Sequence, residues 1–338
     1  MKSALSILAA ASTLALLAAC GGGGDGGTSH PVGPSGLSIT TTNKDTVTRA
    51  AVTGGLAVSN IQTATNSAGT GQQPNGVTAR THALAALAQR ALAAGVRSRM
   101  GIASASAHPA ALSDTAACAV SGSLTTTFDD RDGNGLLSAG DVLSVQFNAC
   151  RDSATSLYNG KAVITLTTVP SASQITASAD FQDVSSVQGG LTSAIDGKLV
   201  IAETDSDTDS TTSLTVGDTA LAITLGSTGY SDVVTLAAAT RIVVDQQFSA
   251  ARTTLTFDGV LQSHALADGS VTLTTPTPIV QLDADAYPSS GVLKAKGGQG
   301  TLLLTVLDAT TVQEQLDADD DGTYESTTTI AWSALIPS

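Results

Sequence analysis

Apolar and polar side chains alternate along most of the chain from Thr115 onward. A repeat of two residues is typical of strands that bury one face, and the Thr, Val and Ile that fill these runs favour extended backbone. Gly, Asp, Asn and Ser bound the runs, as they do in turns between strands. The alternating runs are Val120–Phe128, Ala162–Val169, Leu199–Ala202, Leu221–Leu225, Val233–Leu236, Arg241–Val244, Leu255–Gln262, Val271–Thr275, Leu302–Leu307 and Thr327–Trp332.

This region contains no capped helical pattern that could connect parallel strands. The runs therefore predict an antiparallel all-β domain over residues 115–338. One strand face is apolar and the other is mostly Ser, Thr and Asp, which favours a large open sheet or half-barrel with one solvated face. Two sheets packed as a sandwich are the alternative. Every aromatic residue lies in this region, where rings can build a core.

A helical repeat precedes the strands, at residues 81–94. Its apolar positions fall on one side at 100° per residue, Arg90 lies opposite, and Gly95 can end the helix. The favoured interpretation is an amphipathic helix that covers an apolar edge or face of the sheet; the alternative is a basic helix that contacts anionic lipid or the acidic domain. The rest of residues 20–114 is rich in Gly, Ser and Thr and is predicted to be a tether, with a possible short strand near Leu56–Ile61.

The charge balance disfavours a nucleic-acid partner. The chain has 15 Lys and Arg residues against 29 Asp and Glu residues, a formal net charge of −14, and only 3% aromatic residues. Binding to phosphates requires a basic surface, and stacking on bases requires rings. Most of the acidic excess follows Thr115, in the predicted β domain.

The N-terminus has the pattern of a secretory signal. Lys2 is followed by an apolar run, Ala4–Ala19, that is too short for a permanent transmembrane helix. The sequence Leu17-Ala18-Ala19-Cys20, followed by Gly21, resembles the lipobox of bacterial lipoproteins. This resemblance implies removal of residues 1–19, lipid attachment to Cys20, and a lasting anchor in the outer membrane.

Residues 130–141 fit the frame of a twelve-residue calcium loop, with the turn glycine, Gly135, at position 6. Calcium prefers six to eight hard oxygen ligands, and this spacing turns several oxygens inward together. The candidate ligands are Asp130, Asp132, Asn134, the Leu136 carbonyl, Ser138 and Asp141. The loop resembles those of EF-hands and dockerin modules, but Asp replaces the usual Glu at position 12, and its flanks have the pattern of strands.

Two further segments fit the same frame in part. Residues 207–218 keep Asp at positions 1, 3 and 12 but lack the turn glycine, which predicts poor metal affinity. The segment that begins at Asp317 has an intact first half, then Glu325 at position 9 and Thr328 at position 12. Its candidate calcium ligands are Asp317, Asp319, Asp321 and Glu325. Both segments are interpreted as hairpins, with calcium expected at the one that begins at Asp317.

Short Asn-Gly and Asp-Gly pairs recur at Asn159-Gly160, Asp196-Gly197 and Asp258-Gly259. Each is flanked by strand-like residues, which is weak evidence of duplication, because these pairs are also ordinary turn residues.

Cys118 and Cys150 are the only cysteines left to pair once Cys20 carries lipid, and they bracket the first calcium-type loop. An exported protein meets an oxidising compartment, so we expect a disulfide between them. In the two-residue alternation, Cys118 falls on the apolar face of its strand, whereas Cys150 falls on the polar face of the return strand. A regular ladder would point the two sulfurs to opposite faces, so we predict a β-bulge or a strand end beside the bridge.

Catalytic groups do not converge in the sequence. The four histidines are scattered, and no strand-turn-helix nucleophile motif occurs, so we do not expect an enzyme. Two functions follow. The first is an outer-membrane lipoprotein whose calcium-stabilised β domain has a structural or surface-interaction role. The alternative is a periplasmic carrier that holds a lipid or other apolar ligand on a concave sheet.

Overall fold

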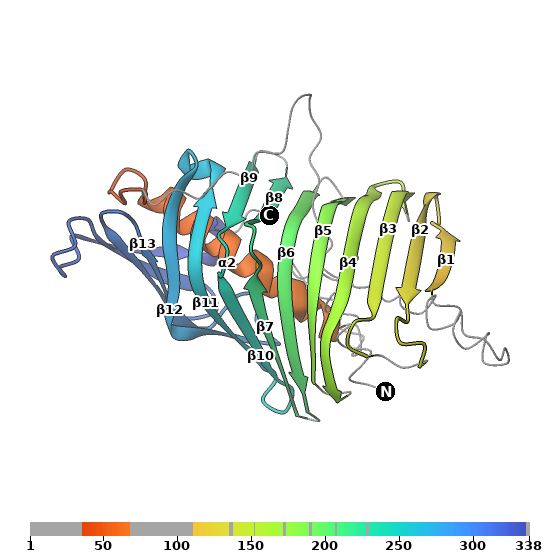
Figure 1. The fold of residues 1–338 in the computed structure, drawn as a ribbon. Coiled ribbons are helices and arrows are strands. Elements are labelled where there is room, and N and C mark those ends of the chain that lie inside the picture. The colour runs from red at the N-terminus through yellow and green to blue at the C-terminus, as the bar shows by residue number, and fades with distance from the viewer. Residues whose placement is uncertain are drawn as a thin grey trace. The chain divides into compact units, whose positions relative to one another are not determined.

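The computed structural model describes residues 36–67, 111–134, 138–151, 153–171, 174–188, 191–206, 208–227 and 230–335, and these are mostly antiparallel β-structure (Figure 1). The all-β prediction is therefore confirmed. The described residues divide into two compact units. Unit 1 contains the strands up to Asp205 and most of β8. Unit 2 contains residues 36–60, 206–222 and 230–335.

Unit 1 is a meander in which each strand pairs antiparallel with the next one along the chain. Strand β8 (Leu221–Ser227) pairs with β6. The meander strands are β1 (Ala111–Ala117), β2 (Ser121–Asp129), β3 (Val142–Arg151), β4 (Ser156–Ser171), β5 (Gln174–Gln188) and β6 (Leu191–Asp205). The first strand begins at Ala111, slightly before the expected boundary at Thr115.

The alternation in the sequence corresponds to alternate burial along these strands. In β3 the side chains of Leu143, Val145 and Phe147 are buried, whereas their neighbours along the strand are partly exposed. This pattern is expected because successive side chains in a strand point to opposite faces of the sheet.

The strands of unit 2 are also antiparallel, and their order is β7-β10-β11-β12-β13-β14-β15-β16. Strand β9 pairs with the end of β11. The elements are β7 (Asp209–Val216), β9 (Tyr230–Leu236), β10 (Arg241–Gln247), β11 (Arg252–Ser263), η1 (His264–Leu266), β12 (Gly269–Leu282), β13 (Ser290–Lys296), β14 (Thr301–Val306), β15 (Thr311–Asp317), β16 (Ser326–Ala331) and α4 (Trp332–Leu335). Within each unit the described strands share one sheet, as in the open-sheet prediction, and do not form the two facing sheets of a sandwich.

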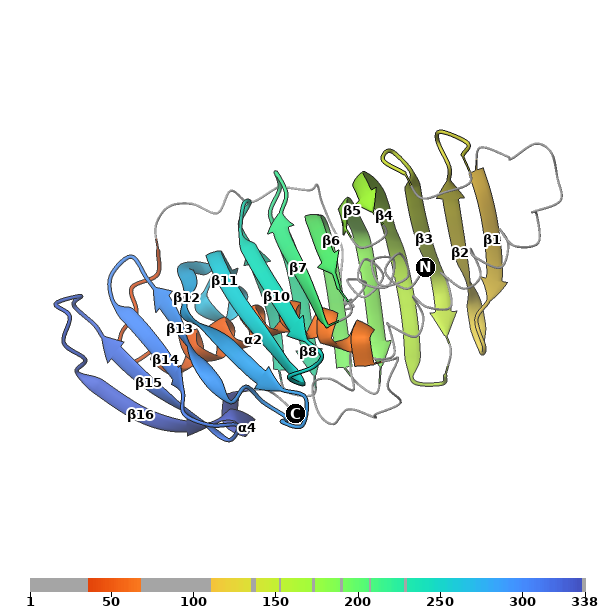
Figure 2. The ribbon, with the colours of Figure 1, turned by 90° about the horizontal axis from the view of Figure 1, so that it is seen from below.

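Helix α2 (Lys44–Ser67) lies against the sheet of unit 2 through its first half (Figure 2). Val47, Thr48, Ala51 and Val52 are buried, a spacing that places them along one side of a helix. The carbonyl of Asn43 accepts hydrogen bonds from the amides of Thr46 and Val47, which starts the helical ladder. None of the helices in the described ranges is long and apolar enough to cross a membrane.

Residues 36–67 correct part of the predicted tether. Leu37 and Ile39 donate backbone hydrogen bonds to Ser270 and Gln299, and Ile39 is fully buried, so residues 36–60 belong to folded unit 2. The possible strand near Leu56–Ile61 is wrong, because these residues continue α2. The helix predicted at residues 81–94, the signal residues 1–19 and Cys20 lie outside the described residues.

A row of β-bulges crosses unit 1. The register shifts between Ser121 and Ser123 in β2, and again in the pairings of β3 with β4, β4 with β5, and β5 with β6. Two bulges repeat one arrangement: a residue with positive φ donates its amide to an Asn or Asp side chain on the next strand. These donors are Ala149, which bonds Asn159 Oδ1 at 2.9 Å, and Asp183, which bonds Asp196 Oδ1 at 3.3 Å. The Asn159-Gly160 and Asp196-Gly197 pairs therefore lie within strands, at bulges rather than at turns.

The predicted disulfide is present between Cys118 and Cys150, whose Cα atoms are 5.5 Å apart. Its predicted bulge is present too, because the register of β3 shifts between Phe147 and Cys150. After the shift, the buried side chains stand at even-numbered instead of odd-numbered positions. Phe147 and Cys150 are therefore both buried although they are three residues apart. A regular strand would have pointed them to opposite faces.

Candidate metal centres

The first candidate centre occupies the hairpin between β2 and β3, as predicted. Asp129 pairs with Val142 at its base, so Asp130 and Asp141 stand at the two ends of the loop. Carboxylate oxygens of Asp130, Asp132 and Asp141 lie within 4.8 Å of one another. Asp130 and Asp141 are buried, whereas Asp132 is exposed. The loop therefore brings three carboxylates together at a position where two of them are largely removed from water.

Hydrogen bonds within the loop orient these carboxylates. Asp141 Oδ1 accepts from the Arg131 amide at 3.0 Å, and Asp141 Oδ2 accepts from the Ser138 amide at 2.9 Å. Asp132 Oδ2 accepts from the Ser138 hydroxyl at 2.8 Å and from Asn134 Nδ2 at 2.8 Å. Because the Ser138 hydroxyl also lies 3.2 Å from Asp141 Oδ2, hydrogen bonds connect the side chains of Asp132, Asn134, Ser138 and Asp141.

The loop favours the charged form of Asp132. The Ser138 hydroxyl and the Asn134 amide donate to this carboxylate and lower its pKa from 3.8. The atoms that this centre offers to a metal are carboxylate and hydroxyl oxygens. Oxygen ligands of this kind suit a hard cation such as calcium better than zinc or copper. Two predicted contributors, Gly135 and the Leu136 carbonyl, lie outside the described residues.

The second predicted frame, residues 207–218, does not form a loop. Residues 209–216 are strand β7, which pairs with β10 from Asp209 to Thr215. Successive side chains of a strand point to opposite faces, so this segment cannot curl around an ion. Its hairpin interpretation is wrong because the absent turn glycine is replaced by β-branched threonines, which favour extended backbone. Asp207 lies outside the described residues.

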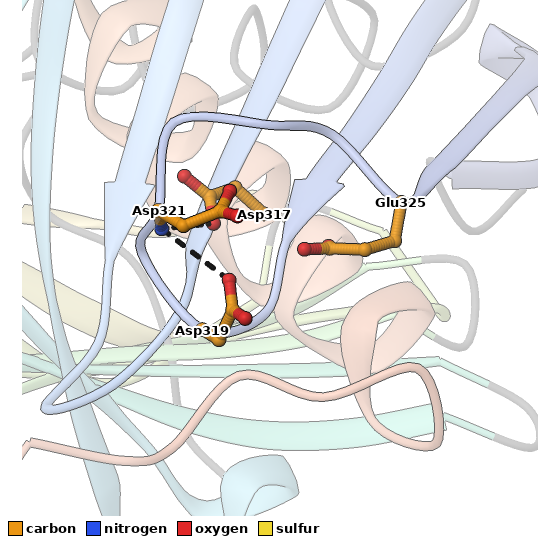
Figure 3. A group of neighbouring side chains, drawn as sticks. All are labelled: Asp317, Asp319, Asp321 and Glu325. Atoms are coloured by element: carbon orange, nitrogen blue, oxygen red, sulfur yellow. Dashed lines mark hydrogen bonds between the residues drawn. The ribbon is translucent and has the colours of Figure 1, made fainter.

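The second candidate centre occupies the loop between β15 and β16. Asp317, Asp319, Asp321 and Glu325 each offer a carboxylate oxygen within 4.8 Å of the others. Figure 3 shows Asp317, Asp319 and Asp321 on one side of the loop, with the Glu325 carboxylate reaching toward them from the opposite side (Figure 3). Only Asp317 is buried. Thr328, predicted at position 12, lies in β16 and is not part of this group.

Backbone amides hold the four carboxylates of the second centre in place. Asp317 accepts from the amides of Asp321 at 3.2 Å and Gly322 at 3.0 Å. Glu325 Oε2 accepts from the Ala318 amide at 2.8 Å, which ties the two ends of the loop together. These bonds give the loop a folded shape with its carboxylates facing one another.

A fifth acidic residue of this loop, Asp320, has a different role that the sequence did not reveal. Its carboxylate contacts the ammonium of Lys296 and accepts from the Gly300 amide and the Thr301 hydroxyl. These partners lie on β13, on β14 and in the turn between them. Asp320 therefore fastens the acidic loop to the neighbouring hairpin, and the lysine and the hydroxyl lower the pKa of its carboxyl from 3.8.

We expect the Asp320→Asn variant to lose part of the pH dependence of stability. A lowered folded-state pKa adds stability that is complete above 3.8 and is lost as the pH falls through the folded value. The unfolding midpoint of the parent chain should therefore fall more steeply than that of the variant between about pH 5 and 2. Urea unfolding at a series of pH values checks this. Asp283→Asn, at an exposed turn, is the control, and parallel curves for the parent and Asp320→Asn would contradict the assignment.

An apolar cavity lies between α2 and the sheet of unit 2. Its lining includes Ala51 and Gly55 of α2, Phe257 of β11, Leu304 of β14 and Trp332 of α4. The volume is about 20 Å³, which is close to the space that one water molecule occupies. With α2 in place, this cavity does not hold an acyl chain.

Comparison with known proteins gives no family for this chain: no protein-family model, no curated protein and no solved structure matches it.

Proposed function

We propose that this chain is a lipoprotein of the outer membrane, anchored through Cys20, whose β-structure is stabilised by calcium and serves a structural or surface-interaction role. The convergence of carboxylates in two hairpin loops carries the calcium part of the proposal. The lipobox-like residues 17–20 support the anchor. The cavity beneath α2, about 20 Å³, gives no support to the alternative role as a carrier of an apolar ligand.

Bound calcium would offset the free-energy cost of bringing these carboxylates together. Like charges that approach one another repel, and a carboxylate loses hydration when it is buried, as Asp130, Asp141 and Asp317 are. The positive charge of a divalent cation placed among these carboxylates would compensate for their mutual repulsion and lost hydration. Their oxygens are also the kind of ligand that calcium prefers. In the first loop, Asp130, Asp132, Asn134, Ser138 and Asp141 would hold the ion. In the second loop, the ligands would be Asp317, Asp319, Asp321 and Glu325.

We expect the full chain to bind calcium and to become more stable as it does so. At a free calcium concentration ten times the dissociation constant, mass action adds about 1.4 kcal/mol for each site. Calorimetric titration of the full chain, together with its melting temperature with and without calcium, measures both effects. The absence of both heat and a melting shift would refute the calcium proposal.

Substitutions at exposed ligands separate the two loops. Asp132→Asn and Asp319→Asn each remove one charge and preserve the shape of the side chain. Both aspartates are exposed, so these variants should fold. Each variant should lose one of two binding events, while Asp283→Asn, at an exposed turn outside both centres, should bind as the parent does. Unchanged titration by Asp132→Asn would remove the first loop from the proposal, and unchanged titration by Asp319→Asn would remove the second.

The anchor has its own test. Mass spectrometry of the mature chain from membranes should find an N-terminal Cys20 that carries lipid, and Cys20→Ala should shift the chain from the membrane fraction to the soluble fraction. Two or more acyl chains give stable anchoring, which makes the expected shift nearly complete. An intact N-terminus at Met1, or membrane binding that survives Cys20→Ala, would contradict the proposed anchor.

A further inference from the structure

Strand β16 is the last strand of unit 2, and its position differs from that of its neighbours. It pairs with β15 along its whole length, from Ser326 opposite Leu316 to Ala331 opposite Thr311. On its other side it pairs with no strand within the described residues. Figure 2 shows β16 at the margin of this sheet. One row of its backbone amides and carbonyls is therefore available for pairing.

The usual protections of such an edge are missing from β16. Protein edges are commonly shielded by lysine, by proline, by bulges or by shortness. The sequence of β16 is Ser-Thr-Thr-Thr-Ile-Ala, which has no charge and no proline, and its register with β15 is unbroken. Thr327, Thr328 and Thr329 are exposed, so both faces of the strand remain open to solvent at its centre. The edge is thus regular in register, uncharged and accessible.

The charges at the two ends of β16 select the partner and its direction. Glu325 and the acidic loop precede the strand, whereas Arg49 lies near its other end, where Arg49 Nη2 donates to the carbonyl of Ala334. Arg49 is exposed. Two copies of β16 paired antiparallel would bring the acidic loop of each copy close to Arg49 of the other. A parallel pair would instead place the two acidic loops side by side, which like-charge repulsion disfavours.

We propose that β16 is a self-association edge, at which a second copy of this chain adds its own β16 antiparallel about a twofold axis. Main-chain hydrogen bonds extend the sheet of unit 2 from one copy into the other, and threonines meet across the junction. A six-residue edge buries less area than a standard protein interface, so the dimer is weak and concentration-dependent. The main-chain pairing depends on neither calcium nor the lipid anchor.

Cysteine scanning of the full chain tests the direction of pairing. Ser326→Cys, Thr328→Cys and Thr329→Cys are oxidised separately at high protein concentration, and the homodimer is measured on a non-reducing gel. Antiparallel pairing places the centre of the strand next to itself, so Thr328→Cys or Thr329→Cys should cross-link at least about tenfold faster than Ser326→Cys. Thr277→Cys, at an exposed position of β12, gives the collisional background, and the parent chain gives the background from its own cysteines.

Each outcome of the scan is decisive. Cross-linking that is uniform along β16 would indicate parallel pairing and would overturn the proposal, as would cross-linking at the level of Thr277→Cys. A second measurement tests the charge argument by sedimentation equilibrium. Arg49→Glu should lower the association constant of the homodimer about tenfold, whereas Arg49→Lys should change it little. Association that is unaffected by Arg49→Glu would remove the charge argument and overturn the proposed arrangement.

Discussion

The Gly160→Ala variant is expected to lose about 3–5 kcal/mol of unfolding free energy. Gly160 has φ +93°, which side-chain-bearing residues rarely adopt. A Cβ atom at this position would lie 2.2 Å from the carbonyl oxygen of Asp183 on β5, which is backbone and cannot rotate away. The strand pair must therefore separate at the bulge, and urea unfolding of the variant measures the cost.

Gly140 supplies a matched control for this prediction. Its φ is +97°, nearly that of Gly160, but a Cβ atom there would meet nothing within 4 Å. Gly140→Ala therefore bears the conformational cost alone, about 1–2 kcal/mol. Both variants are unfolded with urea in calcium-free buffer, because Gly140 lies in the first candidate loop. The difference between the two variants isolates the contact with β5. Equal destabilisation by both would show that the bulge can widen freely and that close strand contact is not what fixes it.

The Glu314→Gln variant is expected to lose about 3 kcal/mol, chiefly by loosening α2 from the sheet of unit 2. Glu314 on β15 is 1% exposed, and it contacts both the ammonium of Lys44 and the hydroxyl of Thr48. The Lys44 side chain is 13% exposed. Burial lowers the pKa of Lys44, but its hydrogen bonds to Asp45 and Glu314 outweigh burial, so the net pKa is raised. Removing the Glu314 charge leaves a mostly buried ammonium without its buried partner.

Two further variants show whether the buried pair itself is responsible. Asp45→Asn removes the other carboxylate that contacts Lys44, but that carboxylate is 79% exposed, so its loss should cost well under about 1 kcal/mol. Lys44→Met combined with Glu314→Leu removes both charges and should be more stable than Glu314→Gln alone. Hydrogen exchange at residues 44–55 should accelerate in Glu314→Gln and not in Asp45→Asn. Equal exchange in these two variants would contradict the role of Glu314.

The raised pKa of Lys44 adds a consequence at alkaline pH. A group whose pKa is higher in the folded state stabilises the protein fully below its unfolded value of 10.5 and loses that contribution as the pH rises through the folded value. The Lys44–Glu314 pair therefore contributes across the physiological range.

The sequence predicts the strands well because their signal is local. Alternation in the predicted run Ala162–Val169 corresponds to alternate burial, with Ala162, Ile164 and Leu166 buried. The parity conflict between Cys118 and Cys150 correctly predicted a bulge beside the disulfide. The loop between β2 and β3 was also recognisable, because the calcium frame depends on spacing within twelve residues. Local spacing is what a single sequence displays most clearly.

Helix α2 was missed because its local preferences disagree with its structure. Its first half carries β-branched residues and the pair Gly54-Gly55, all of which are poor helix formers. Packing against distant strands overrides this preference: a Cβ atom on Gly54 would lie 2.4 Å from a methyl carbon of Leu261, so the glycine allows the helix to approach the sheet closely. Asp320 was missed for a related reason, since its partner Lys296 is far away in the sequence.

The contact between Lys44 and Glu314 joins residues 270 positions apart, and it sets an order of events during biogenesis. Hairpins such as β2–β3 can form as soon as their residues emerge, because their contacts are short-range. Helix α2 is made well before β15, yet its binding surface is completed only when β15 has been made. Contacts between residues so distant in sequence form slowly, so the apolar face of α2 is expected to stay exposed until the last strands are made.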